Sequence, residues 1–174
     1  MSREWVGHSC PAADEASAPH FKGPVISKII SGGQTGVDRA ALDVAMELGI
    51  ECGGWCPKGR RAEGRPIPKR YPLKETPSTA YPQRTKRNVS DSDATLILTL
   101  RPPQGGTALT IRLARHLNKP WKVVRLNGAP DIEGIGSWLE RKKIGILNVA
   151  GPRESENPGI HAMACDFLRQ LLIG

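Results

Sequence analysis

Aromatic residues and long apolar runs are both scarce in this chain. Aromatic residues make up 5% of its 174 residues. No segment approaches the roughly 20 consecutive apolar residues that a membrane-spanning helix needs. The first ten residues also lack the apolar core that a signal peptide contains. We therefore expect neither a membrane span nor a signal peptide.

Cysteine is scarce as well, and its spacing does not suit a metal. Three residues separate Cys52 from Cys56, and no second pair of Cys or His residues with similar spacing accompanies them. Structural zinc sites use four ligands, usually arranged in two pairs. We expect no metal site in this chain, and we interpret these two cysteines as buried thiols near a strand.

Length and composition favour one globular domain. Hydrophobic residues make up 39% of the chain, and its length suits an α/β domain with its own core. Residues 1–22 are rich in Ala, Pro and Ser without a period, so we expect a flexible tail followed by a domain over 23–174. The net charge of +8 suits a nucleic acid or an anionic small ligand, and charge alone does not choose between them.

The most informative segment is a glycine-rich turn that follows the apolar run 25–31. Residues 37–48 then show the apolar period of an amphipathic helix. A strand, a glycine turn and a helix start direct backbone N–H groups and the positive end of a helix dipole at one point. We therefore expect an anion site here. Its predicted residues are Gly32, Gly33, Gln34, Thr35, Gly36, Asp38 and Arg39.

This turn departs from two common nucleotide-binding patterns. A P-loop places Lys and then Ser or Thr after its second glycine, whereas Gly36 is followed by Val37 and Asp38. The dinucleotide fingerprint is G-x-G-x-x-G, whereas the glycines here give G-G-x-x-G. The turn therefore favours neither ATP hydrolysis nor ordinary NAD binding. Asp38 either complements the helix dipole or orients an amine of the ligand.

Apolar runs and amphipathic segments alternate along the rest of the chain. We expect strands over 25–31, 50–55, 94–100, 121–126 and 144–150. We expect helices over 37–48, 77–89 and 131–142, after the turn 102–107, and after the turn 151–155. The segment 57–76 is basic and rich in Pro and Gly, and we expect it to be irregular. This alternation predicts a doubly wound, Rossmann-like parallel sheet of about five strands with helices on both faces.

The predicted topology brings three turns to one edge of the sheet. Right-handed crossovers place every strand-to-helix turn at the carboxyl ends of the strands, where ligands bind in such folds. The second and third turns add Gly105, Gly106, Thr107, Arg153, Glu154 and Ser155 to the predicted anion site. Glu154 either accepts hydrogen bonds from a ligand or complements a helix N-terminus.

The predicted helix 77–89 carries a polar stripe where a core stripe would be apolar. Its members recur at helical spacing, and they are Arg84, Thr85 and Asn88, in register with Tyr81. Such a stripe faces either solvent or a site. At a site, the Arg84 guanidinium would hold an anionic group through two parallel hydrogen bonds.

Several blocks in series resemble the molybdenum cofactor carrier family. They are SGGQTGVDRAALD (31–43), GGWCPKGRRAE (53–63), YPL (71–73), RT and NV (84–89), DSDAT (91–95), GGTA (105–108) and NVAGPRES (148–155). The resemblance runs from about residue 28 to the C-terminus. It implies a cytoplasmic, Rossmann-like homo-oligomer that binds, stores and protects molybdenum cofactor for delivery to molybdoenzymes, without catalysis. That cofactor is a phosphorylated pyranopterin whose dithiolene holds molybdate.

One position departs from the family pattern. The family places an acidic residue and then Gly after the glutamate that corresponds to Glu63, whereas this chain has Gly64 and Arg65. The change removes a negative charge and adds a positive one. It either strengthens anion binding or marks the loop as a surface feature.

Two relatives of that family offer alternative functions. The LOG enzymes, which hydrolyse nucleotide 5′-monophosphates, carry P-G-G-x-G-T-x-x-E. Residues 104–110 resemble this motif but lack its glutamate, which argues against the hydrolase. The DNA-processing family has a similar Ser-Gly turn and binds single-stranded DNA. The positive charge suits that role, but the low aromatic content offers few platforms on which bases stack.

Overall fold

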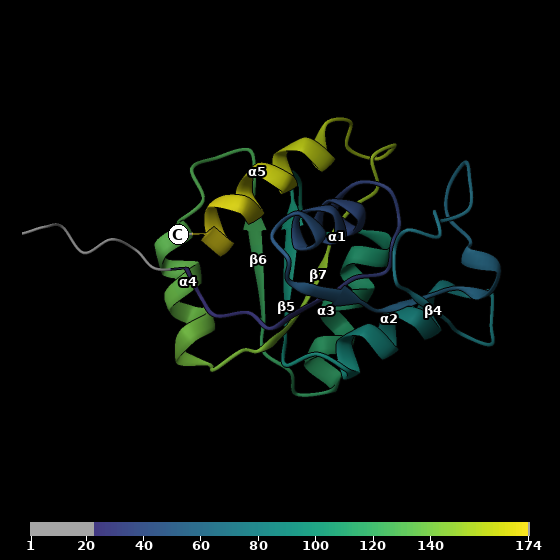
Figure 1. The fold of residues 1–174 in the computed structure, drawn as a ribbon, viewed down its shortest axis with the longest axis horizontal. Helices are drawn as coiled ribbons and strands as arrows, with labels where there is room; N and C mark the ends of the chain where they lie inside the picture. Colours follow the sequence, from purple (N-terminus) through teal and green to yellow (C-terminus); the bar gives the residue numbers. More distant parts are fainter. Residues whose placement is uncertain (1–22, 174) are drawn as a thin grey trace, which may run out of the picture.

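A five-stranded parallel sheet runs through the middle of the computed structural model, which describes residues 23–173 (Figure 1). Its strands are β1 (Lys28–Ile30), β2 (Glu51–Gly53), β5 (Ala94–Thr99), β6 (Trp121–Arg125) and β7 (Ile146–Ala150). They follow the order β2-β1-β7-β5-β6, and every neighbouring pair is parallel. The predicted doubly wound sheet is confirmed. The predicted tail 1–22 lies outside the described residues.

Five α-helices cover the two faces of this sheet. They are α1 (Val37–Glu47), α2 (Tyr81–Ser90), α3 (Gly105–His116), α4 (Ile132–Arg141) and α5 (Ile160–Ile173). The connection from β1 to β2 and the connection from β5 to β6 cross the sheet in opposite directions. Right-handed crossovers therefore place α1 and α3 on opposite faces. In Figure 1, α5 lies beside α1 and also contacts α4, whereas α2 packs on α3.

The core follows the central strands. All six residues of β5 are buried, and the three apolar residues Leu96, Ile97 and Leu98 alternate between the faces of the sheet. Strands that are buried on both faces are apolar nearly throughout, as parallel sheets require. The apolar faces of α1 and α5 pack against each other over one side of this sheet. Among the described residues, no helix has both the length and the apolar character that crossing a membrane requires.

The region 50–76 is more ordered than its sequence predicts. The predicted strand 50–55 is interrupted at Gly54, whose φ is +131° and whose missing Cβ would lie 2.3 Å from the carbonyl oxygen of Ser31. The chain resumes as β3 (Trp55–Cys56), which pairs in parallel with β4 (Lys74–Glu75) in a separate two-stranded sheet. The prediction that 57–76 is irregular throughout is therefore wrong, since it contains β4 and the 3₁₀ helix η1 (Lys58–Arg60).

A second, smaller core holds this region in place. Its buried residues are Leu42, Cys56, Ile67, Tyr71 and Leu73. They come from three separate segments, and those in 57–76 have no helical or strand period. Periodicity therefore gave no sign of them, because their burial depends on contacts that are distant in sequence.

Helix boundaries differ from the predicted ones by a few residues. The second predicted helix starts at Tyr81 rather than at residue 77, with Pro82 in its first turn, where proline is well tolerated. The last helix begins at Ile160, after a loop over 151–159. That longer loop allows the third predicted turn to reach over the N-terminus of α1.

Candidate functional site

The three predicted turns meet at the carboxyl ends of β1, β5 and β7, which are the central strands of the sheet. A cleft of about 320 Å³ lies there and continues into a second one of the same size along the loop after β5. The structure brings half of the predicted site residues into the first cleft. They are Gln34, Asp38, Arg84, Thr85, Gly105, Gly106, Thr107 and Arg153.

A buried ion pair forms the floor of the cleft. The guanidinium of Arg84 lies 3.1 Å from the carboxylate of Asp38, and the two side chains are 15% and 4% exposed. Burial raises the pKa of the Asp38 carboxyl, and the charge of Arg84 opposes that rise. The guanidinium rests on Gly32, where an added Cβ would lie 1.4 Å from its nitrogen. This glycine therefore makes room for the arginine.

Further cations surround the rim. The guanidinium carbons of Arg61, Arg84 and Arg153 lie 6.0, 5.9 and 5.2 Å from the ring centroid of Tyr81, which also lines the cleft. Arg112 lines it from α3. Guanidinium groups favour the faces of aromatic rings, and they also bind phosphate and carboxylate through paired hydrogen bonds. The rim is therefore suited to an anionic ligand that has a flat ring.

The N-terminus of α3 is open to the cleft. Added Cβ atoms on Gly105 and Gly106 would meet nothing within 4 Å, and both residues are exposed. Among residues 23–173, no acceptor is found for their backbone N–H groups, whereas the N–H of Thr107 donates to Gln104. Free N–H groups and the helix dipole together attract an anion. This is the arrangement that the sequence predicts for the second turn.

The first turn differs, because protein groups already occupy two of its donors. The backbone N–H of Gln34 donates to Asp38, and that of Val37 donates to the carbonyl of Pro152. An added Cβ would lie 2.5 Å from the side chain of Leu73 at Gly33 and 2.6 Å from the Pro152 oxygen at Gly36. These two glycines therefore permit close packing against the second core and the loop after β7.

The third turn is tied to the first through Glu63, which lies outside the predicted set of site residues. The carboxylate of Glu63 accepts hydrogen bonds from the hydroxyls of Thr35 and Ser155. Partial burial opposes ionisation of this carboxyl, but the hydrogen bonds from Ser155 and Thr35 outweigh it and lower its pKa. Glu63 lies in one of the sequence blocks quoted above. Only that resemblance pointed to it, since no local pattern marks the residue.

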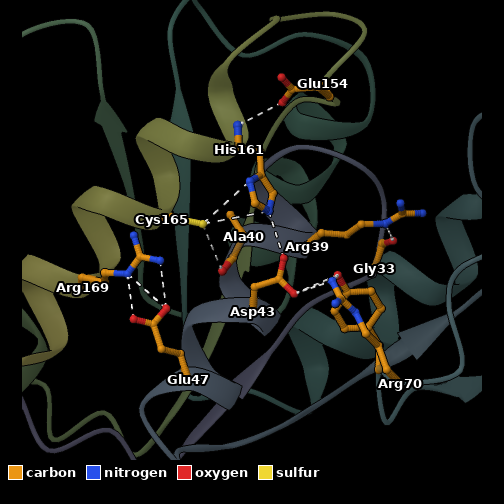
Figure 2. Close-up of polar contacts among 11 residues, drawn as sticks. Gly33, Arg39, Ala40, Asp43, Glu47, Arg70, Glu154, His161, Cys165 and Arg169 are labelled. Carbon is orange, nitrogen blue, oxygen red and sulfur yellow. Dashed lines mark hydrogen bonds and ion pairs between the residues drawn. The ribbon is translucent and has the colours of Figure 1, made fainter.

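Three of the predicted residues make contacts elsewhere. Figure 2 shows the guanidinium of Arg39 donating to the carbonyl of Gly33, 3.1 Å away. The carboxylate of Glu154 accepts from the backbone N–H of Gly159 and from that of His161, the second of which Figure 2 shows, so it complements the N-terminus of α5. Asn88 is buried and holds β3.

The Asn88 side chain binds both backbone groups of one residue. Its oxygen accepts from the Trp55 N–H at 2.7 Å, and its nitrogen donates to the Trp55 carbonyl at 3.0 Å. An asparagine placed in this way pairs like a neighbouring strand. The polar stripe on α2 is therefore divided, since Arg84 and Thr85 line the cleft and Asn88 joins α2 to β3.

The described cysteines are free thiols. Burial raises the pKa of Cys56 and of Cys165, so both are protonated at neutral pH. Cys165 lies near His161, whose ring contacts Asp43 between α1 and α5 (Figure 2). In residues 23–173, no group of three or more His, Cys, Asp or Glu side chains is arranged to hold a metal ion.

Comparison with known proteins gives one family and one solved structure. The model of the circularly permutated YpsA SLOG family matches residues 29–172. A crystal structure from Syntrophus aciditrophicus SB, of a protein called a "putative molybdenum carrier protein", is 46% identical and has a TM-score of 0.82. The match covers 87% of this chain and 98% of that one. No curated protein matches the chain significantly. These similarities confirm the resemblance stated above, and the chain belongs to the circularly permutated YpsA SLOG family.

Proposed function

We propose that this protein binds molybdenum cofactor as cargo in the cleft and carries it without catalysis. The observation that supports this most strongly is that the open N-terminus of α3 shares the cleft with Arg84, Arg112 and Arg153. The 46% identity to the protein called a "putative molybdenum carrier protein" agrees with this proposal. As the family resemblance implies, we propose a cytoplasmic homo-oligomer that passes its cargo to molybdoenzymes.

The residues of the cleft fit the chemistry of this cargo. Its phosphate would accept hydrogen bonds from the backbone of Gly105 and Gly106 and from the hydroxyl of Thr107. Its flat pterin ring would lie near Tyr81 and the surrounding guanidinium groups, which stack on such rings. A cleft of about 320 Å³ is within the range of small-ligand sites.

A binding role suits the carboxylates of the cleft better than hydrolysis does. Among the described residues, Asp38 and Glu156 are the carboxylates that line it. Asp38 pairs with Arg84, and Glu156 accepts from the backbone N–H of Arg153 at 3.1 Å. Thr110 stands near the place of the LOG glutamate, and its hydroxyl donates to the Gly106 carbonyl. Each carboxylate is engaged in holding the site together, so we do not favour the nucleotide hydrolase.

The test is a substitution that fills the cleft without disturbing the fold. Gly106→Leu places a side chain in space that is now open, so we expect cofactor affinity to fall by roughly a hundredfold, since the side chain blocks the phosphate from the backbone donors. Gly128→Leu is the matched control, because an added Cβ there also meets nothing within 4 Å and the residue lies outside the cleft. Calorimetric titration with molybdenum cofactor, AMP and single-stranded DNA provides the measurement.

Each result of that titration has a definite meaning. Cofactor binding that is lost in Gly106→Leu and kept in Gly128→Leu supports the proposal. Equal binding by both variants contradicts the assigned cleft. Binding of AMP or DNA in place of cofactor contradicts the carrier function itself.

A further inference from the structure

The carboxylate of Glu63 lies where an oxyanion is expected from the sequence. It sits between the first and third turns, at the carboxyl ends of β1 and β7. One oxygen is bound by the Thr35 hydroxyl and lies 3.5 Å from the backbone N–H of Ser155, and the other lies 2.5 Å from the Ser155 hydroxyl. Two hydroxyls and a backbone N–H that converge in this way form a set of donors suited to a carboxylate or a phosphate.

The segment that carries Glu63 is attached to the domain at few points. We call residues 61–66 the strap. Apart from the Glu63 carboxylate, the strap's hydrogen bonds to the rest of the domain come from one side chain, Gln34, which donates to the Arg61 carbonyl at 3.3 Å and accepts from the Glu63 N–H at 3.4 Å. Arg61 also lies near the Tyr81 ring, and Ala62 packs against the second core. The residues at 64–66 are exposed, and Gly64 has a φ of +72° with open space around it. Releasing the carboxylate would therefore free most of the strap.

The base of the strap is firmly held, which limits any movement to the strap itself. The guanidinium of Arg60 donates to the carbonyls of Ile67, Pro68, Tyr71 and Leu73. Ile67 is buried in the second core. The segment on either side of 61–66 therefore stays in place when the strap moves.

We propose that Glu63 is an internal substitute for an oxyanion: Thr35 and Ser155 form a site for a carboxylate- or phosphate-class anion, which the strap fills until such an anion displaces it. This inference rests on the proposed function and deepens it. It adds a contact that an anion controls, between Glu63 and the first and third turns, at the same edge of the sheet as the cleft. The strap is linked to the cleft through Gln34, which lines the cleft and binds the strap.

Charge and tethering explain why the Glu63 carboxylate and a free anion compete for the site formed by Thr35 and Ser155. The lowered pKa keeps Glu63 ionised at neutral pH, and the positive charge of Arg153 contributes to that shift. A tethered carboxylate competes at a high effective concentration. A phosphate carries more charge and more acceptor oxygens than a carboxylate, so it is able to take the site from Glu63.

The experiment is chemical rescue of a variant that lacks the carboxylate. Glu63→Ala is expected to unfold at a lower temperature than the wild type. Acetate or inorganic phosphate should bind it roughly tenfold more tightly than the wild type, because the internal competitor is gone. The matched control is Glu75→Ala, whose carboxylate accepts, within residues 23–173, from the backbone N–H of Gly59 alone, at 2.6 Å. We expect that neither anion restores the unfolding temperature of the control. We expect the same of the double variant in which Ser155→Ala is added to Glu63→Ala.

A measurement on the wild type keeps the inference falsifiable if Glu63→Ala does not fold. Saturating phosphate should increase amide hydrogen exchange across 61–66 while exchange in η1 is unchanged. Equal anion binding by Glu63→Ala and Glu75→Ala, or unchanged exchange in the strap, overturns the inference. The rescue experiment uses acetate and phosphate and does not depend on molybdenum cofactor. If rescue is observed but the protein does not bind molybdenum cofactor in the titration described above, the proposed function is overturned and the inference about the strap still holds.

Discussion

At the residue scale, the pairing of Arg84 with Asp38 decides the electrostatics of the cleft. Both groups are nearly buried, and Arg84 Nε has no hydrogen-bond partner among the described residues. A buried charge is costly unless it is paired. The guanidinium of Arg84 therefore compensates the buried charge of Asp38.

Arg84→Met should destabilise the protein by about 3–5 kcal/mol at pH 7, because it leaves the Asp38 carboxylate buried without its partner. Burial already raises the pKa of Asp38 above its unfolded value. A group of this kind contributes its stability below the unfolded pKa and loses it as pH rises through the folded pKa. The deficit of the variant should therefore shrink between pH 7 and pH 5.

Urea unfolding of the wild type and the variant at both pH values measures this effect. The control is Lys86→Met, an exposed cation on the same helix, which should change stability little at either pH. A deficit that is the same at pH 5 and pH 7 would show that lost packing, rather than the uncompensated charge, accounts for the effect.

At the element scale, the polar side chains of α2 form one stripe in the sequence but have two separate roles in the structure. Its first turns place Tyr81, Arg84 and Thr85 in the cleft, and its last turn holds β3 through Asn88. The glycine turns that precede α1 and α3 also differ in what they contact. The glycines before α1 pack closely against Leu73 and Pro152, whereas those before α3 border open space.

Asn88→Ala should destabilise the protein by about 2 kcal/mol, since it leaves the N–H and the carbonyl of Trp55 without their partners. The loss should appear in urea unfolding followed by tryptophan fluorescence. Ser90→Ala, at the exposed end of the same helix, is the control and should be close to neutral. A neutral Asn88→Ala would mean that water replaces the side chain at no cost.

At the scale of the whole molecule, the topology separates charges between the two faces. Arg, Lys and His are the only charged or basic residue types in α2 and α3, and neither helix contains a carboxylate. The carboxylates of the described α-helices all belong to α1, α4 and α5 on the other face. A surface with one sign of charge attracts ligands of the opposite sign and speeds their association. The α2 and α3 face borders the cleft through both helices.

Lys86→Glu on α2 should slow the association of molybdenum cofactor roughly twofold at low salt, because it weakens this attraction. Lys142→Glu, which makes the same change at the end of α4, should slow it much less. Stopped-flow binding at two ionic strengths is the measurement, and the difference should narrow as salt screens the charges. Equal effects of the two variants would mean that net charge alone governs association.

The sequence by itself predicted the sheet, because alternating apolar runs and amphipathic segments leave few other arrangements for an α/β chain. It also predicted that three turns meet at one edge, since right-handed crossovers require it. The blocks quoted above identified the family, which the comparisons confirm.

Only the tertiary structure decided which predicted groups face the cleft. Gly33 and Gly106 belong to similar turns, yet one packs against Leu73 and the other borders open space. Glu154 and Glu63 both carry a charge near the third turn, yet one complements α5 and the other binds Ser155. These differences arise from contacts between segments that are distant in the chain. Local periodicity determines which residues enter a helix or strand, and long-range packing determines what each of them touches.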